Sequence, residues 1–139
     1  MRMAQGRLVV ETGGQGLYEV TAEIAAWVAS QGISAGLLTL FLRHSSASIL
    51  IQENAAPEVR EDLLAFLRDL APEETSRWRH QDEGPDDMPA HIKSALLPTQ
   101  LAVLVAEARL LLGTWQGIYV VEHRRASHRR ELVLHLVGE

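Results

Sequence analysis

Residues 37–52 read LLTLFLRHSSASILIQ, and this stretch decides the fold. Residues 37–42 are almost uniformly apolar, which is typical of a strand covered on both faces. Residues 48–52 form a second strand of similar character, and the polar segment His-Ser-Ser at 44–46 separates the two. A tight return at this segment would pair the strands and place its side chains at one end of a sheet. The stretch therefore predicts a buried sheet with a polar site where the chain turns.

Toward the N-terminus, a Gly-Gly-Gln-Gly turn separates two short runs at 7–12 and 17–20. The runs and the turn between them predict a β-hairpin. Residues 21–31 follow and predict a helix, with Thr21 as its N-cap and Gly32 as its stop.

Toward the C-terminus, residues 57–70 show the clearest helical pattern. A proline suits the first turn of this helix, and Pro72 closes it. The residues 79–88 are polar and acidic and predict a loop, and 89–97 predict a short helix that Pro98 ends. The helix over 57–70 carries one apolar stripe, formed by Val59, Leu63, Phe66, Leu67 and Leu70.

Further strands are predicted at 102–106, 117–122 and 132–137, and a basic turn over 124–127 joins the last two. Strands and helices do not alternate strictly along the chain, so a parallel βαβ winding is disfavoured. We therefore predict a single α+β domain over residues 1–139, with a mainly antiparallel β-sheet or sandwich and about three helices.

The composition narrows the classes of function. Of the 139 residues, 47% are hydrophobic and 22% charged, as in an ordinary globular domain. The absence of cysteine excludes disulfides, thiolate metal sites and cysteine nucleophiles. A formal net charge of −5 disfavours nucleic acid as a partner. Neither a secretory signal nor a long apolar run is present, which predicts a cytoplasmic protein without a membrane partner.

His44 is the first candidate site residue. It follows Arg43 and precedes Ser45 and Ser46 at the end of a hydrophobic strand. An imidazole can bind a metal or move a proton, and hydroxyl and guanidinium groups suit phosphate oxygens. The alternative is a strand-end turn whose histidine bonds the backbone, and this motif alone leaves both interpretations open.

His80 and His91 flank an acidic loop. Two imidazoles with carboxylates nearby could bind zinc or another transition metal. The alternative is a solvated loop in which Asp86 or Asp87 caps the following helix, and for the carboxylates alone we favour that alternative. Taken with His44, the two histidines predict a polar pocket that binds a metal or a phosphate.

Two further groups of residues could contribute. Glu53 and Asn54 follow the second strand of the opening stretch and could lie at the same sheet end as His44, as base, ligand or support. Alternatively, Asn54 caps a helix and Glu53 is exposed. The segment with Thr114, Trp115 and Gln116 could stack on and hydrogen-bond a heteroaromatic ring, although a bulge with a core tryptophan is the general expectation.

The basic residues near the C-terminus also allow two interpretations. They could bind an anion, a phosphate or RNA, but a solvated hairpin tip is the favoured interpretation. RNA receives little weight in an acidic chain without interleaved aromatic residues. The cluster comprises His123, Arg124, Arg125, His128, Arg129 and Arg130.

The chain resembles the YjbQ-like family of small proteins, described as secondary thiamine-phosphate synthases. Several blocks match in the same order, which makes the resemblance specific. One departure is Glu107-Ala108, where an Asp-Gly turn is usual. The matching blocks are HSSAS (44–48), EN (53–54), HQDEGPDDMPAHIK (80–93), LGTWQ (112–116), EHR (122–124), Arg130 and the closing GE (138–139).

The resemblance implies an α+β fold and a homotrimer with a pocket near the subunit boundaries. It also implies weak synthase activity, which joins a hydroxymethylpyrimidine pyrophosphate to a thiazole phosphate. It further implies a divalent metal held by His44, His80 and His91.

On this interpretation Arg43, Arg130 and a cation would receive the pyrophosphate, with Ser45, Ser46 and Thr114 as further polar contacts. Trp115 and Gln116 would hold a ring. His44, His80 and His91 would serve as ligands or acid–base groups, with Glu53 and Asn54 in support.

Other functions stay open. Pyrophosphate chemistry normally uses magnesium, which prefers oxygen ligands, whereas three histidines suit zinc. Zinc with an open position favours hydrolysis, so a metal-dependent hydrolase of a small phosphorylated metabolite is a competing hypothesis. A third hypothesis is a non-catalytic trimer that binds a metal or a phosphometabolite.

Overall fold

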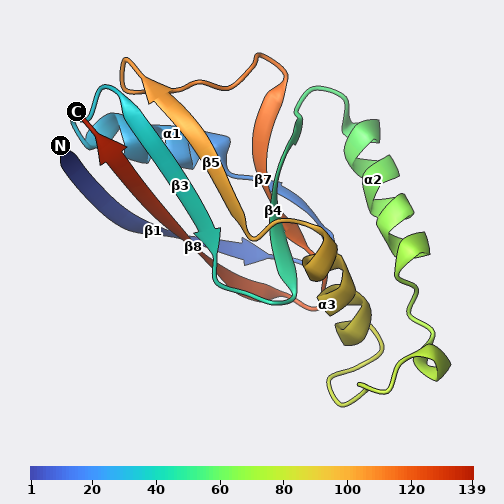
Figure 1. Ribbon diagram of the computed structural model, residues 1–139. Coiled ribbons are helices and arrows are strands. Elements are labelled where there is room, and N and C mark those ends of the chain that lie inside the picture. The colour runs from blue at the N-terminus through green and yellow to red at the C-terminus, as the bar shows by residue number, and fades with distance from the viewer.

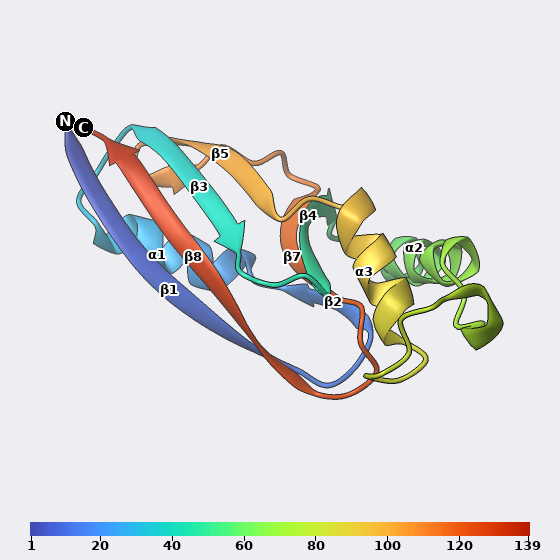
Figure 2. The same ribbon diagram turned by 60° about the horizontal axis from the view of Figure 1, so that its bottom comes forward.

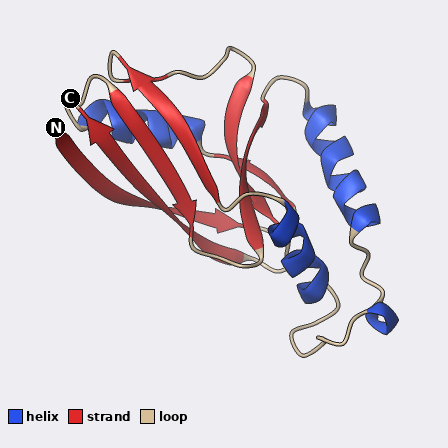
Figure 3. Ribbon diagram, viewed as in Figure 1, coloured by secondary structure: helices blue, strands red, loops and turns tan.

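The computed structural model describes residues 1–139 apart from the side chain of Thr75. Its antiparallel sheets curl into a half-barrel, with helices along the sides (Figures 1 and 3), so the predicted α+β class is confirmed. The elements in chain order are β1 (Arg2–Thr12), β2 (Gly16–Glu19), α1 (Thr21–Ser30), β3 (Gly36–Leu42), β4 (Ala47–Glu53), α2 (Pro57–Leu70), η1 (Thr75–Arg77), α3 (Asp87–Leu96), β5 (Gln100–Ala106), β6 (Arg109–Leu110), β7 (Gln116–Glu122) and β8 (His128–Gly138).

The strands form a larger sheet in the order β1-β8-β3-β5-β6 and a smaller sheet in the order β2-β7-β4. The longest ladder joins the first and last strands, from Arg2 opposite Gly138 to Thr12 opposite His128. The two chain ends therefore lie side by side (Figure 2), and the Met1 amino group is 3.1 Å from Glu139 Oε1.

The predicted hairpins are wrong. β1 pairs with β8 and β2 with β7, so the strands on either side of the Gly-Gly-Gln-Gly turn lie in different sheets. The same holds for β3 and β4, and for β7 and β8. Each short connection carries the chain from one sheet to the other. Turn residues mark where a strand ends, but burial across the whole core selects its partner.

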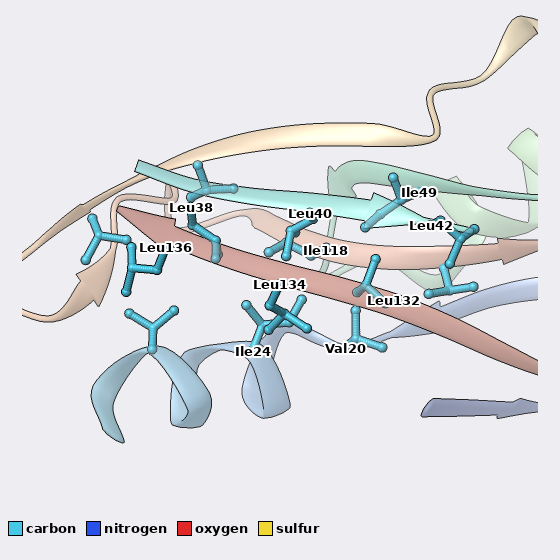
Figure 4. Packing of buried hydrophobic residues seen from close by; sticks show 14 of the residues in the cluster. Val20, Ile24, Leu38, Leu40, Leu42, Ile49, Ile118, Leu132, Leu134 and Leu136 are labelled. Atoms are coloured by element: carbon cyan, nitrogen blue, oxygen red, sulfur yellow. The ribbon is translucent and has the colours of Figure 1, made fainter. Parts of the chain in front are cut away.

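The core lies between the larger sheet, helix α1 and the smaller sheet (Figure 4). Ile24 of α1 packs toward the leucines of β8, among them Leu134. β3 contributes alternate side chains only: Leu38 is fully buried, whereas Leu37 is 45% and Phe41 46% exposed. The expectation that this strand is covered on both faces is therefore wrong, and one face of the larger sheet is open.

Details of the helices differ from prediction. Thr21 is the first residue of α1 rather than its N-cap, and its Oγ1 accepts a hydrogen bond of 2.9 Å from the Ile118 N–H. α2 has the predicted bounds, but Phe66 on its apolar stripe is 61% exposed, because this helix lies to the side of the sheets (Figure 1). At the turn before β6, Glu107 and Ala108 have φ of 53° and 59°, the left-handed conformation for which Asp-Gly is better suited.

Candidate functional site

The site is built where helix α3 lies against the β3–β4 crossover. The Ser94 hydroxyl donates a hydrogen bond of 2.8 Å to the Ala47 carbonyl, which ties the helix to the start of β4. One turn earlier on the same helix, His91 Nδ1 donates a hydrogen bond of 2.9 Å to the carbonyl of Ser45. The crossover therefore fixes the orientation of the His91 ring.

His80, Asp87 and His91 form the centre of the site. Asp87 Oδ2 lies 2.8 Å from His80 Nε2 and 3.2 Å from His91 Nε2. One ligand atom from each residue falls within 4.8 Å of the others. Two ligands on a tetrahedral ion at about 2.0–2.1 Å would lie about 3.3 Å apart, so the three atoms need little movement to share one ion.

The hydrogen bonds decide which nitrogen of His91 faces this centre. A carbonyl can only accept, so Nδ1 carries the proton that goes to Ser45. In the neutral ring, Nε2 then presents a lone pair toward the Asp87 carboxylate. Two acceptors facing each other need either a second proton on the ring or a cation between them. A histidine whose other nitrogen donates to a backbone carbonyl in this way is typical of metal sites.

Arg124 contacts Asp87 through the carboxylate oxygen that does not face the two histidines. Its Nη1 lies 2.9 Å from Asp87 Oδ1, although this buried oxygen has no aligned hydrogen-bond donor in the described part of the chain. Its Nε donates to Asp86 Oδ2 at 3.0 Å. Burial alone raises the pKa of Asp87, but the hydrogen bond from His80 and the charges of His91 and Arg124 outweigh it and lower the pKa. Asp87 is therefore ionised and available to a cation.

The structure corrects two expectations about charged residues. Neither Asp86 nor Asp87 makes a side-chain cap on α3, and Asp87 is only 1% exposed. The basic segment is solvated only in part: Arg125 and Arg129 are exposed, whereas His123 and Arg130 are almost fully buried. Asp87 precedes His91 by one helical turn, so the spacing could have suggested it as a partner. No pattern in the sequence indicates that Arg124 pairs with Asp86 and Asp87.

Arg130 belongs to a buried ion pair that holds the two sheets together. Its Nε and Nη2 donate to the two Glu122 oxygens at 2.8 and 2.5 Å. Thr12 Oγ1 donates to Glu122 at 2.6 Å, and Arg130 also donates to Ser46 Oγ at 3.0 Å. Burial alone raises the pKa of Glu122, but the bonds from Arg130 and Thr12 lower it below its usual range. This pair positions the crossover instead of facing solvent as a phosphate receptor.

A pocket of about 310 Å³ opens beside this centre. His44 and His91 form part of its wall, with the hydroxyl residues Ser45 and Thr99. His44 Nε2 accepts a hydrogen bond of 2.8 Å from the Glu131 N–H, and its Nδ1 lies 3.4 Å from Arg130 Nη1. Burial and then the charge of Arg130 lower the pKa of His44. His44 is not among the three residues whose ligand atoms converge, so its role as a metal ligand stays a prediction.

The remaining candidates lie elsewhere. The expectation that Glu53 and Asn54 share a sheet end with His44 is wrong. β4 pairs with β7 from Ala47 opposite Glu122 to Glu53 opposite Gln116, so the two ends are about 20 Å apart. Glu53 accepts hydrogen bonds from backbone N–H groups just before α2.

The segment before β7 belongs to this second end. Asn54 Nδ2 lies 3.4 Å from the carbonyls of Thr114 and Gln116. Trp115 is 64% exposed, so the alternative of a core tryptophan is wrong. Arg43 pairs with Glu131 at 2.7 Å. Within one chain, the ring-stacking candidates and the histidine centre are therefore separate.

His123 predicts a pH-dependent stability. It is buried against Ser48 Oγ at 2.8 Å, and burial, followed by the charge of Lys93, lowers its pKa from 6.5 to about 3. The unfolded chain takes up a proton as the pH falls through 6.5, whereas the folded chain does not until about 3. We therefore expect acidification from about pH 7 to pH 5 to remove about 2 kcal/mol of stability through this group alone.

Chemical denaturation across this pH range tests the expectation. His123→Gln should show a flatter dependence of the unfolding free energy on pH, whereas His135→Gln, on the open face of β8, should match the wild type. An unchanged slope in His123→Gln would contradict the assignment.

Fold and site together define a class: a small half-barrel α+β protein with a buried carboxylate held between two histidines and an arginine. The chain belongs to the YjbQ-like UPF0047 family, whose model matches residues 7–139. It is 48% identical to a UPF0047 protein of Synechocystis sp. over 99% of this chain and 94% of that protein. It is 40% identical to YjbQ of Escherichia coli O157:H7 over 97% and 98%.

Solved structures agree with the fold. A YbjQ-like protein of unknown function from Sulfolobus solfataricus superposes with a TM-score of 0.87 at 25% identity, covering 99% of this chain and 100% of that one. A conserved hypothetical protein from Thermus thermophilus gives 0.85 at 34% identity, covering 95% and 99%. Among the residues that the structure describes, every helix is too short or too polar to cross a membrane.

Proposed function

We propose that the protein is a metal-dependent enzyme that hydrolyses a small phosphorylated metabolite in the pocket beside His91. One observation carries the proposal: a ring nitrogen of His80, a ring nitrogen of His91 and an oxygen of Asp87 lie within 4.8 Å of one another. The Ser45 carbonyl fixes the His91 ring with its other nitrogen toward that point. This is a donor set for a divalent transition metal.

The donor set also bears on the identity of the metal. Two imidazole nitrogens and one carboxylate suit zinc, manganese or iron better than magnesium, which prefers oxygen ligands and water. The buried Asp87 Oδ1, which lacks an aligned donor in the described residues, is a further group that a cation would satisfy. When bound, such an ion supplies Lewis acidity toward a phosphoryl oxygen and favours the ionisation of water.

The residues of the chain would then do the following. Arg124 keeps Asp87 ionised and in place. The pocket wall offers the hydroxyl groups of Ser45 and Thr99 to phosphate oxygens. The Glu131 N–H engages His44 Nε2 and Arg130 Nη1 faces its Nδ1, so neither ring nitrogen is free to act as a general base.

A test combines metal content with turnover. Tag-free protein purified without chelator should hold close to one transition-metal ion per chain and release phosphate from simple phosphate monoesters. In His80→Ala, we expect both the metal and at least about 100-fold of the turnover to be lost. His128→Ala, a matched change at a histidine whose Nδ1 donates to the Ala126 carbonyl outside this centre, should retain both.

Absence of metal from all three proteins would contradict the metal centre. Bound metal without turnover would instead favour the non-catalytic alternative, in which the pocket binds a metal or a phosphometabolite as a sensor or store.

Thiamine-phosphate synthesis is the second candidate, because exposed Trp115 beside Gln116 offers a stacking surface for a ring. In one chain this surface lies at the far end of β4 and β7 from the histidine centre. The reaction would therefore need a neighbouring subunit to bring the two together. Assay of pyrophosphate release in the presence of both rings, with Trp115→Ala as the variant, separates this activity from simple hydrolysis.

Self-association, which the resemblance implies as a homotrimer, has independent support. The open face of the larger sheet presents large apolar side chains, which monomeric proteins rarely leave in contiguous patches. Neighbouring positions on β3 and β5 contribute Leu37, Phe41 and Leu104 to this face.

A further inference from the structure

A second pocket, of about 280 Å³, lies between the end of α2, helix α3 and the segment after β7. It shares no lining residue with the pocket beside His91. Its charged lining residues are Arg68, Glu73, Lys93 and Arg125.

Lys93 is the unusual group in this pocket. It is the one lysine in the sequence, yet it is only 3% exposed. Within the described part of the chain its ammonium makes neither a hydrogen bond nor an ion pair. Asp86 is the carboxylate that acts on its charge, and that carboxylate is already engaged by the Arg124 side chain and the Arg125 N–H. A buried charge without a partner is costly, so the site lacks a counter-ion.

The other charged side chains of the pocket do not supply a counter-ion for Lys93. Arg125 Nε donates to Glu73 Oε1 at 3.0 Å, so the one lining carboxylate is occupied. Arg68 makes no hydrogen bond or ion pair among the described residues and acts on Lys93 as a like charge. The buried Lys93 and the exposed Arg68 thus face one cavity without an ion-pair partner among the described residues, although the chain as a whole carries a net charge of −5.

We propose that this pocket binds a phosphate-class oxyanion, either inorganic phosphate or the phosphate group of a small metabolite. Lys93 would be the central donor, with the Arg68 and Arg125 side chains completing the contacts. Donors from three separate elements suit a tetrahedral oxyanion, and guanidinium groups match its oxygens. The site does not depend on the metal centre, so its test is independent of the proposed function.

The single lysine makes the site directly observable. Protein labelled with ¹³C at lysine Cε gives one lysine signal, which belongs to Lys93. The full chain is titrated with inorganic phosphate at constant ionic strength, with chloride as the reference salt. We expect a saturable shift of this signal in the millimolar range or below, and none with chloride. A parallel titration with an alkyl phosphate monoester distinguishes the sources: tighter binding indicates a metabolite, and equal or weaker binding indicates inorganic phosphate.

Variants test the residues. Arg68→Gln should weaken phosphate binding about tenfold, whereas Arg109→Gln on β6 should leave it unchanged. In Lys93→Met, the phosphate-dependent rise of the melting temperature should disappear, while the melting temperature without phosphate should rise because an unpaired buried charge is gone. The proposal is overturned if the Lys93 signal does not saturate with phosphate, or if Arg68→Gln binds phosphate as tightly as the wild type.

Discussion

Replacing Glu122 with glutamine is expected to lower the free energy of unfolding by about 3–5 kcal/mol, because it leaves the buried Arg130 guanidinium without its counter-charge. Both side chains are nearly inaccessible, and two of the Arg130 nitrogens bond the two oxygens of this one carboxylate. Thr12 and the Arg124 N–H would lose an ionised acceptor as well. Urea denaturation at pH 7 measures the change.

The matched control is Glu11→Gln on β1. Glu11 pairs with Arg129 at 3.6 Å, but both side chains are more than 70% exposed, so we expect a change below about 0.5 kcal/mol. The double variant Glu122→Gln with Arg130→Gln should recover part of the loss, since no buried charge remains. The single variant Arg130→Gln completes the comparison. If the double variant loses as much unfolding free energy as the two single variants together, the pair is not coupled and this account is contradicted.

Local sequence patterns predict the elements of this fold better than their partners. α2 has the predicted bounds because a proline, an apolar stripe and Pro72 are all local signals. The wrong hairpins arise because the two runs beside a turn need not pair with each other. In this half-barrel, β8 lies between β1 and β3, and β7 between β2 and β4. Those neighbours are set by which apolar faces meet in the core, across separations from 63 residues, between Glu53 and Gln116, to 136 residues, between Arg2 and Gly138.

For the candidate site too, the sequence indicates which residues take part better than it indicates how they contact one another. The sequence places His80 and His91 on either side of an acidic loop, and the structure brings both to one carboxylate. It could not indicate that Asp87 would be buried between them, because an aspartate at the start of a helix usually caps it or faces solvent. The expectation that Glu53 shares a sheet end with His44 rests on the assumption that β3 pairs with β4. Once the strands lie in different sheets, that assumption fails.

Asp87→Asn is expected to reduce the affinity for zinc or manganese by more than about 100-fold with little change in shape. The amide keeps the volume of the carboxylate but loses the negative charge, and the nearby Arg124 guanidinium then repels a divalent cation. Competition with a chelator of known affinity measures the loss, and the turnover of a phosphate monoester should fall with it.

Asp86→Asn makes the comparison decisive, because it changes the same chemistry one residue away. Asp86 also holds Arg124, through Nε at 3.0 Å, but it is not among the three residues whose ligand atoms converge. If Asp87 is a ligand, Asp86→Asn loses stability while retaining most of its metal affinity, and Asp87→Asn loses the metal. If both variants lose metal affinity equally, the displacement of Arg124 accounts for the loss. Asp87 would then not be a ligand, and the wild type would hold the ion through the two histidines alone.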